Sequence, residues 1–150
     1  MEWDIIIKVS QAFLTPIIGV AVVYIAWQQH KTNRNKFRLD LYDRELKVFE
    51  GLTTLLQHIV RQGTATGEQV QQYKMSTLEA VFLFNEDIVN YLKEVKSKVH
   101  KLQFVNRIVD KKLSPKRETE VMKEQSDLYD WFNIQLTESV NKFKKALRFE

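Results

Sequence analysis

The longest apolar stretch of the chain runs from Ile5 to Trp27, IIIKVSQAFLTPIIGVAVVYIAW. At about 1.5 Å of rise per residue, a helix of this length covers the roughly 30 Å hydrocarbon core of a bilayer. The pattern therefore predicts an N-terminal transmembrane helix. It also predicts two parts, a membrane part over residues 1–30 and a second domain over residues 31–150.

Polar and small residues within this run recur on one helical face. They follow one another at steps of three or four residues: Lys8, Gln11, Thr15 and Gly19. Polar groups inside a membrane usually face a bundle interior or a water-filled cavity. Because one span supplies no such interior, the stripe predicts a homo-oligomer in which these residues line a pore or an interface. In the competing interpretation Lys8 lies at the membrane edge and the span is only an anchor.

Two positions along the first helix are candidate gating hinges. Pro16 lacks the amide hydrogen that the Ala12 carbonyl would accept. Asn33 lies in Thr32–Asn35, a polar stretch of poor helix formers. No glycine or proline occurs in residues 20–50, so the pattern also allows the membrane helix to continue unbroken into the second domain.

The flanks of the apolar run predict its orientation. The N-terminal flank is acidic, whereas the C-terminal flank carries the basic residues His30, Lys31, Arg34, Lys36 and Arg38. Basic flanks stay on the cytoplasmic side, and aromatic residues such as Tyr24 and Trp27 gather at the interface. We therefore expect a single-pass membrane protein with its N-terminus outside and its second domain in the cytoplasm.

Beyond the membrane run, apolar residues three or four apart predict three long amphipathic helices. Their expected buried faces are Tyr42, Leu46, Phe49, Leu52, Leu56 and Ile59; Ile88, Leu92, Val95, Val99, Leu102 and Val109; and Val121, Leu128, Phe132, Leu136, Val140, Phe143 and Leu147. Gly63–Gly67 should end the first helix, Asn85 should cap the second, and Ser114-Pro115 should open the third. The expected fold class is all-α, with a transmembrane helix that continues into a cytoplasmic antiparallel helical bundle.

Residues 66–84 should form short connectors between the first two long helices. Thr66 with Gln69, and Ser76 with Glu79, each have the spacing of a capping box. The connector also contains a dense apolar cluster, Leu78, Val81, Phe82, Leu83 and Phe84. We expect this cluster to fill the bundle core, with a subunit interface as the alternative.

Basic residues concentrate in residues 93–117. Five of them fall near one helical face and are our candidate polyanion-binding residues: Lys93, Lys96, His100, Arg107 and Lys111. Clustered cations supply the sequence-independent phosphate attraction of nucleic-acid binding. Two alternatives remain open at this stage, because lysine-rich helices are often simply solvated and because the next helix begins with acidic residues that could neutralise this face.

Residues suited to catalysis or metal binding are sparse. The chain has no cysteine, and its three histidines, His30, His58 and His100, are far apart in the sequence. Gly63–Gly67 lacks the lysine and the spacing of a phosphate-binding loop. We therefore expect no enzyme, no metal site and no cofactor.

Several short blocks carry a resemblance to known proteins, namely residues 32–34, 38–44, 82–84 and 131–132. On these blocks the chain resembles small, mostly uncharacterised bacterial membrane proteins with one N-terminal span and a helical cytoplasmic part. By layout it is also similar to the membrane effectors of the Hailong anti-phage defence system. That similarity implies a homo-oligomeric ion channel that oligodeoxyadenylate from a partner nucleotidyltransferase keeps closed, and that opens when infection removes this ligand. It also implies a location in the bacterial inner membrane, and it assigns no residue roles.

Three functional hypotheses follow from the sequence. The first is a pore gated by a nucleotide or oligonucleotide, formed by a homo-oligomer for which a tetramer is the first candidate. The second is a membrane-tethered helical module that recruits a protein partner. The third is a basic domain held against anionic lipid on the inner leaflet.

Overall fold

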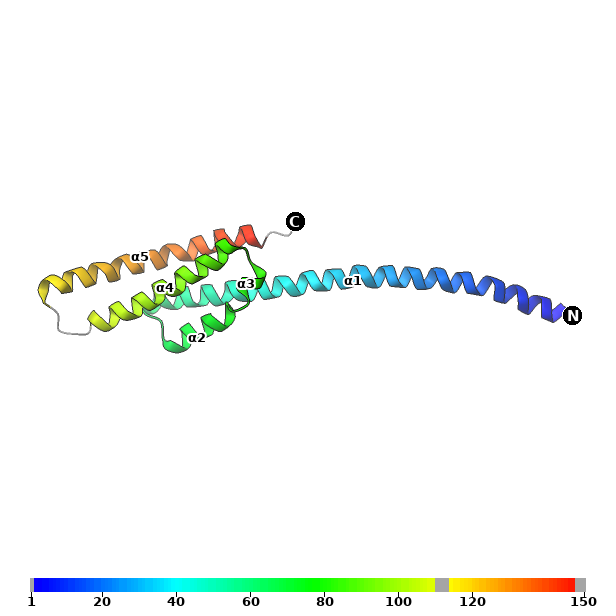
Figure 1. Ribbon diagram of the computed structural model, residues 1–150, viewed down its shortest axis with the longest axis horizontal. Coiled ribbons are helices and arrows are strands. Elements are labelled where there is room, and N and C mark those ends of the chain that lie inside the picture. The colour runs from blue at the N-terminus through cyan, green and yellow to red at the C-terminus, as the bar shows by residue number, and fades with distance from the viewer. Residues whose placement is uncertain (1, 110–113, 148–150) are drawn as a thin grey trace. The chain divides into compact units, whose positions relative to one another are not determined.

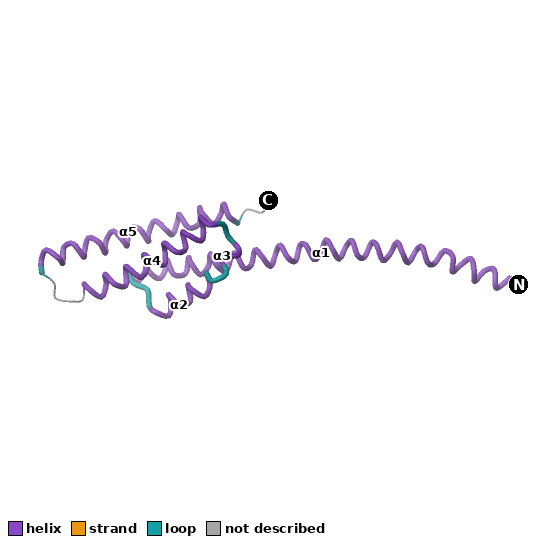
Figure 2. Tube along the Cα trace, in the orientation of Figure 1, coloured by secondary structure: helices purple, strands orange, loops and turns teal. Residues whose placement is uncertain are grey.

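The computed structural model describes residues 2–109 and 114–147, and it describes side chains in these ranges from residue 18 onward. The described residues form the helices α1 (Glu2–Gln62), α2 (Gly67–Ser76), α3 (Ala80–Leu83), α4 (Glu86–Val109) and α5 (Pro115–Ala146), as Figure 1 shows. They contain no strand (Figure 2). The all-α prediction is therefore confirmed. Two compact units divide the chain, Met1–Leu41 and Tyr42–Glu150.

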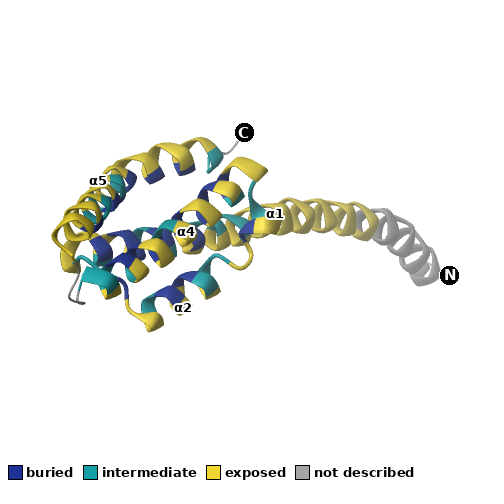
Figure 3. Ribbon diagram, turned by 60° about the vertical axis from the view of Figure 1, so that its left-hand side comes forward, coloured by how far each residue is buried: buried dark blue, intermediate teal, exposed yellow. Residues whose placement is uncertain are grey.

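The described residues of the first unit all belong to the N-terminal part of α1, up to Leu41. Its described side chains from residue 18 to residue 40 are all exposed (Figure 3). The candidate hinge around Asn33 is helical, and the neighbouring Thr32 hydroxyl donates a hydrogen bond to the Gln28 carbonyl at 3.0 Å. Within the described residues, no helix is long and apolar enough to cross a membrane.

The second unit is a helical bundle. The C-terminal part of α1 packs with α4 and α5, and α2 and α3 connect α1 to α4. Its fully buried apolar side chains come from all three long helices: Val48, Leu52, Leu56, Ile59, Val95, Val99, Leu102, Val105, Phe132 and Phe143. At one end Phe143 packs between Phe49 and Phe84, with both ring-centroid distances at 5.2 Å. The predicted antiparallel arrangement is confirmed for α5 but is wrong for the pair α1 and α4, which run in the same direction (Figure 1). Phe49 and Phe84 both contact Phe143 at one end of the bundle, and Gly63 lies beside Asn106 at the other end. The reason is that α2 and α3 carry the chain back along the bundle before α4 begins.

The buried faces differ from the predicted ones at particular positions. In α1, Val48 and Leu55 are buried, whereas the predicted Tyr42 is only half-buried. Because α1 packs against residues of α2, α4 and α5 in one core, the buried face of α1 is wider than a single stripe of residues. In α5, the predicted Val140 is 46% exposed, whereas Ser139 is fully buried. The Ser139 hydroxyl donates to the Leu136 carbonyl at 3.3 Å, and this local bond makes its burial tolerable.

The predicted caps are confirmed at two of three positions. The Gln69 amide donates to the Thr66 hydroxyl at 3.2 Å, and the Thr66 amide donates to the Gln69 side-chain oxygen at 2.9 Å. The Ile88 amide donates to the Asn85 side-chain oxygen at 3.2 Å. The predicted capping box at Ser76 and Glu79 is wrong. Ser76 ends α2 and donates to the Tyr73 carbonyl, and Glu79 precedes α3 without a side-chain cap.

A network of polar side chains holds the turn after α1 against the bundle. The Asn106 amide nitrogen and the Tyr129 hydroxyl both donate to the Gly63 carbonyl, at 3.0 and 2.7 Å. Gln125 in turn donates to the Asn106 side-chain oxygen at 2.8 Å, and Gln103 donates to the Ala65 carbonyl at 2.7 Å. Gly63 has φ 71°, a left-handed conformation that favours glycine at a helix end. The network fixes the path of the chain between α1 and α2.

Candidate functional site

The predicted basic residues of α4 form one exposed face. At 100° per residue, Lys93, Lys96, His100 and Arg107 fall within about 60° of one another around the helix. All four side chains are exposed, and none forms an ion pair with another described residue. The buried side of the same helix, centred on Val95 and Val99, points in a different direction. Lys111, the fifth predicted residue, lies outside the described residues.

The acidic start of α5 does not neutralise this face. Lys101 pairs with Glu124 at 2.6 Å, and the Lys98 ammonium lies 5.4 Å from the centroid of the Trp131 ring. These two lysines therefore face α5, whereas the four predicted residues remain turned to solvent. Among the described residues, Lys101 is the one basic residue of α4 that forms an ion pair with an acidic residue of α5.

An aromatic side chain that the sequence analysis did not select lies on the same face. Phe104 is 62% exposed, and at 100° per residue it lies about 20° from Lys93 and about 40° from His100 around the helix. Exposed aromatic rings next to cations provide stacking surfaces for unpaired bases. Its spacing of four residues from His100 was a signal that could have identified it. We define the α4 basic face as Lys93, Lys96, His100, Phe104 and Arg107.

The end of the predicted membrane run forms a second exposed surface. Large apolar side chains point to all sides of α1 here, and each is at least half exposed: Ile18, Val20, Val22, Val23, Tyr24, Ile25 and Trp27. The rings of Tyr24 and Trp27 lie 6.4 Å apart. A helix that is apolar all round normally lies inside a large core or inside a membrane. No described residue covers these side chains, which are all exposed.

The structure describes only one residue of the predicted polar stripe. Gly19 is exposed, with open space where a side chain would lie. Lys8, Gln11 and Thr15 lie outside the residues whose side chains are described, and so does the candidate hinge Pro16. The pore-lining role of all four stripe residues stays a prediction.

The apolar cluster of the connector is not the core element that we expected. Leu78, Val81 and Phe82 are exposed by 68%, 62% and 88%, and Met75 joins them at 64%. Only Leu83 and Phe84 pack against the core. The core prediction is therefore wrong for the three exposed residues, because α3 is only four residues long and presents just one side to the bundle. We call Met75, Leu78, Val81 and Phe82 the connector patch.

Two buried tyrosines have raised pKa values for the same main reason, desolvation. Burial raises the pKa of Tyr73, and the nearby Tyr91 raises it further. Burial also raises the pKa of Tyr91, with smaller contributions from Glu94 and Glu138. The Tyr73 hydroxyl donates to the Leu92 carbonyl at 2.8 Å, whereas the buried Tyr91 hydroxyl has no hydrogen-bond partner among the described residues. Both phenols are neutral at physiological pH.

Comparisons with protein-family models, with curated proteins and with solved structures find no match to this chain. No group of histidine, cysteine and acidic side chains suited to holding a metal ion occurs in the described part of the chain. The α4 basic face, the apolar surface of α1 and the connector patch are therefore the features on which a function can be argued.

Proposed function

We propose that the chain is a homo-oligomeric membrane effector, an ion channel whose N-terminal helices enclose the path and whose α4 basic face binds a regulatory nucleotide or oligonucleotide. In the bacterial anti-phage setting that the sequence resemblance implies, a partner nucleotidyltransferase would make this ligand. The observation that carries the proposal is the α4 basic face, in which unpaired cations flank an exposed aromatic ring.

The apolar surface of α1 supports the membrane part of the proposal. Burying a valine or isoleucine side chain contributes about 1.5–3 kcal/mol, so the five valines and isoleucines around this helix, together with Tyr24 and Trp27, strongly favour an apolar environment. A single partner helix would cover one side only, whereas lipid covers every side. Basic residues begin at His30 and Lys31, three and four residues after Trp27, as expected where a helix leaves the hydrocarbon core on the cytoplasmic side.

The dimensions of the α4 basic face support an extended anion. From Lys93 to Arg107 the helix rises about 21 Å, so the face is much longer than a single phosphate group. The cations attract phosphates, and Phe104 offers a surface on which a base can stack. A strand with several phosphates and unpaired bases uses both kinds of group, whereas an inorganic polyphosphate uses only the cations.

The binding proposal can be tested by removing three cations from the face. In the triple variant Lys93→Gln, Lys96→Gln and Arg107→Gln, we expect weaker binding of a short single-stranded oligodeoxyadenylate. For single strands the logarithm of the affinity falls with the logarithm of the salt concentration by about 0.7 per neutralised phosphate, so the slope should become shallower by about 2. Fluorescence anisotropy across a salt series measures both quantities.

The matched control removes three exposed cations from α5, in Lys116→Gln, Arg117→Gln and Lys123→Gln. This control should leave the slope nearly unchanged. Equal losses in both triple variants would contradict a dedicated face on α4. Phe104→Leu should weaken oligonucleotide binding by about 1–3 kcal/mol and leave polyphosphate binding unchanged, and equal losses for both ligands would refute base stacking.

A second candidate function is a membrane tether that recruits a protein, and the connector patch favours it. Phe82 is 88% exposed, and an exposed apolar cluster of this kind is typical of protein-binding surfaces. The two functions differ in what the membrane helix must do. Gln11→Leu should change conductance in a pore and leave a tether intact, and unaltered currents from an assembled protein would refute the pore.

A further inference from the structure

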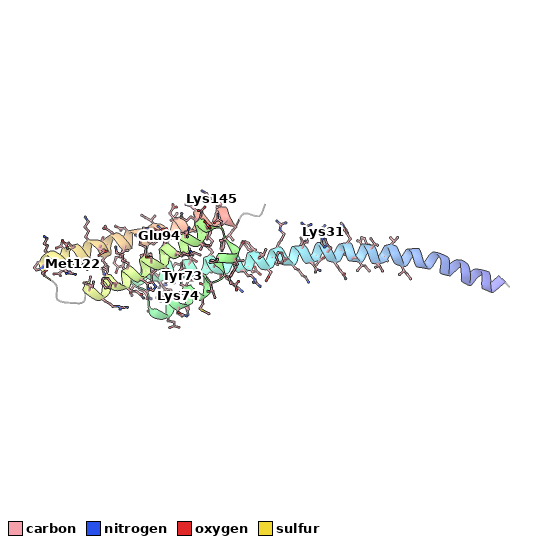
Figure 4. All side chains as sticks on the ribbon, viewed as in Figure 1. Lys31, Tyr73, Lys74, Glu94, Met122 and Lys145 are labelled. Atoms are coloured by element: carbon pink, nitrogen blue, oxygen red, sulfur yellow. The ribbon has the colours of Figure 1, made fainter. Side chains whose placement is uncertain are left out.

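A narrow row of cations follows Trp27 along one side of α1. Lys31, Arg34 and Arg38 stand four, seven and eleven residues after Trp27, so all four side chains fall within about 40° of the Trp27 direction. We call these four residues the juxtamembrane stripe. Lys36 lies on the opposite side of the helix, two residues from Arg34. Figure 4 shows Lys31 among the exposed side chains of α1.

The stripe surrounds a shallow hollow that suits an anion. The hollow has a volume of about 230 Å³ and is lined by Trp27, His30, Lys31, Arg34, Asn35 and Arg38. The Lys31 ammonium lies 5.8 Å from the centroid of the Trp27 ring, so the ring places this charge at the apolar end of the stripe. Arginine side chains are well suited to phosphate because their planar donors bind two oxygens at once.

Like charges at this spacing repel one another on an isolated helix. Lys31 and Arg34 are three residues apart and both exposed, so an anion in the hollow would relieve this repulsion. The apolar surface of α1 ends at Trp27, where the stripe begins. An anion bound here is therefore at the level of the lipid headgroups if the preceding residues lie in hydrocarbon.

We propose that the juxtamembrane stripe binds the phosphate of anionic phospholipid headgroups. This binding determines the direction in which α1 tilts, because it holds one side of the helix at the membrane surface. This inference rests on the membrane insertion in the proposed function, and it adds a lipid class and a residue set. Lipid is favoured over a nucleic acid strand because the stripe continues directly from an all-round apolar surface and its first member is a tryptophan. The tilt of a membrane helix is set by interfacial anchors of this kind.

The test uses Trp27 as its own reporter. In the full-length chain, Trp3→Phe and Trp131→Phe leave Trp27 as the only tryptophan. The protein is reconstituted into vesicles of phosphatidylcholine and phosphatidylglycerol in which one or the other lipid carries bromine, a quencher of tryptophan fluorescence. We expect brominated phosphatidylglycerol to quench Trp27 fluorescence more strongly than its mole fraction in the bilayer predicts.

Matched single substitutions then locate the binding residues. A basic residue near an anionic surface contributes about 1 kcal/mol, which corresponds to about fivefold in association. Arg34→Gln should therefore lower the enrichment of phosphatidylglycerol around Trp27 about fivefold. Lys36→Gln removes the same charge from the opposite side and should have a clearly smaller effect. Both side chains are exposed, so neither substitution disturbs the packing.

Five outcomes would overturn the proposal. Equal quenching by the two brominated lipids, or equal effects of Arg34→Gln and Lys36→Gln, would show that the stripe has no specific role. Loss of the enrichment on adding inorganic phosphate at constant ionic strength would assign the hollow to free phosphate. Oligonucleotide binding that Arg34→Gln abolishes would assign it to nucleic acid. Quenching by neither lipid would mean that α1 does not enter the bilayer, and this result alone would also refute the proposed membrane anchor.

Discussion

The close contact between α1 and the end of α2 gives a prediction whose sign depends on one neighbouring residue. Gly51 lies in the middle of a helix, where alanine is normally more stable by about 1 kcal/mol. A Cβ atom at residue 51 would lie 2.5 Å from the Ser76 Cβ and closer still to the Ser76 hydroxyl oxygen. Carbon atoms pack at about 3.5–4.0 Å, so Gly51→Ala forces the two helices apart by an ångström or more.

The two effects oppose each other, and their sizes can be compared. Overpacking of this kind costs about 1–3 kcal/mol, which exceeds the gain in helix propensity. Gly51→Ala should therefore destabilise the chain by about 1–2 kcal/mol. In a Ser76→Gly background the obstructing atoms are gone, and the same substitution should stabilise the chain by up to about 1 kcal/mol.

Thermal unfolding of the four proteins of this double-mutant cycle, in a mild detergent and followed by circular dichroism, measures both terms. For a domain of this size a change of 1 kcal/mol shifts the Tm by about 4–8 °C. Gly51→Ala should lower the Tm in the parent and raise it in the Ser76→Gly background. The same sign in both backgrounds would refute the steric argument.

Three further predictions concern single side chains of the bundle. Tyr91→Phe should be neutral or stabilising because the Tyr91 hydroxyl has no hydrogen-bond partner among the described residues, whereas Tyr73→Phe should cost about 1 kcal/mol through its lost hydrogen bond. Because folding raises the pKa of both tyrosines, the free energy of unfolding should fall as the pH rises above about 10. This fall should be smaller in Tyr91→Phe. Asn106→Leu should cost about 1–3 kcal/mol by leaving the Gly63 carbonyl and the Gln125 amide with fewer partners, and urea unfolding measures this loss. Burial raises the pKa of Glu45, so folding favours its protonated form; the unfolding free energy contributed by this group should rise as the pH falls from 7 toward 4, and Glu45→Gln should remove that rise in a pH series.

The sequence predicted the helices and most of their ends because those depend on local chemistry. Apolar residues at helical spacing marked α4 and α5, and the Thr66–Gln69 capping box formed as expected. Ser139 stands seven residues after the buried Phe132 and four before the buried Phe143, so its spacing places it on the buried face. It was missed because an apolar pattern does not count a serine, whose hydroxyl bonds within its own helix. The network on the Gly63 carbonyl also escaped prediction, since it joins side chains that are 43 and 66 residues away from it in the sequence.

The candidate site was predicted in part. Four of the five basic residues proved to share an exposed face of α4, as their spacing indicated. Phe104 was missed because an apolar residue on a helix is usually assigned to the core, although its spacing of four residues from His100 places it near the basic residues. Three residues of the connector patch, Leu78, Val81 and Phe82, were assigned to the core for the same reason. Composition shows that such residues prefer burial, but it does not show whether the fold provides a place for them.

Conductance of the purified full-length protein in planar bilayers tests the central proposal most directly. The account predicts discrete currents that a short single-stranded oligonucleotide alters, and it predicts that the triple variant Lys93→Gln, Lys96→Gln and Arg107→Gln conducts but responds less to the oligonucleotide. Silence under all conditions, from protein shown to be inserted and folded, would contradict a ligand-controlled channel.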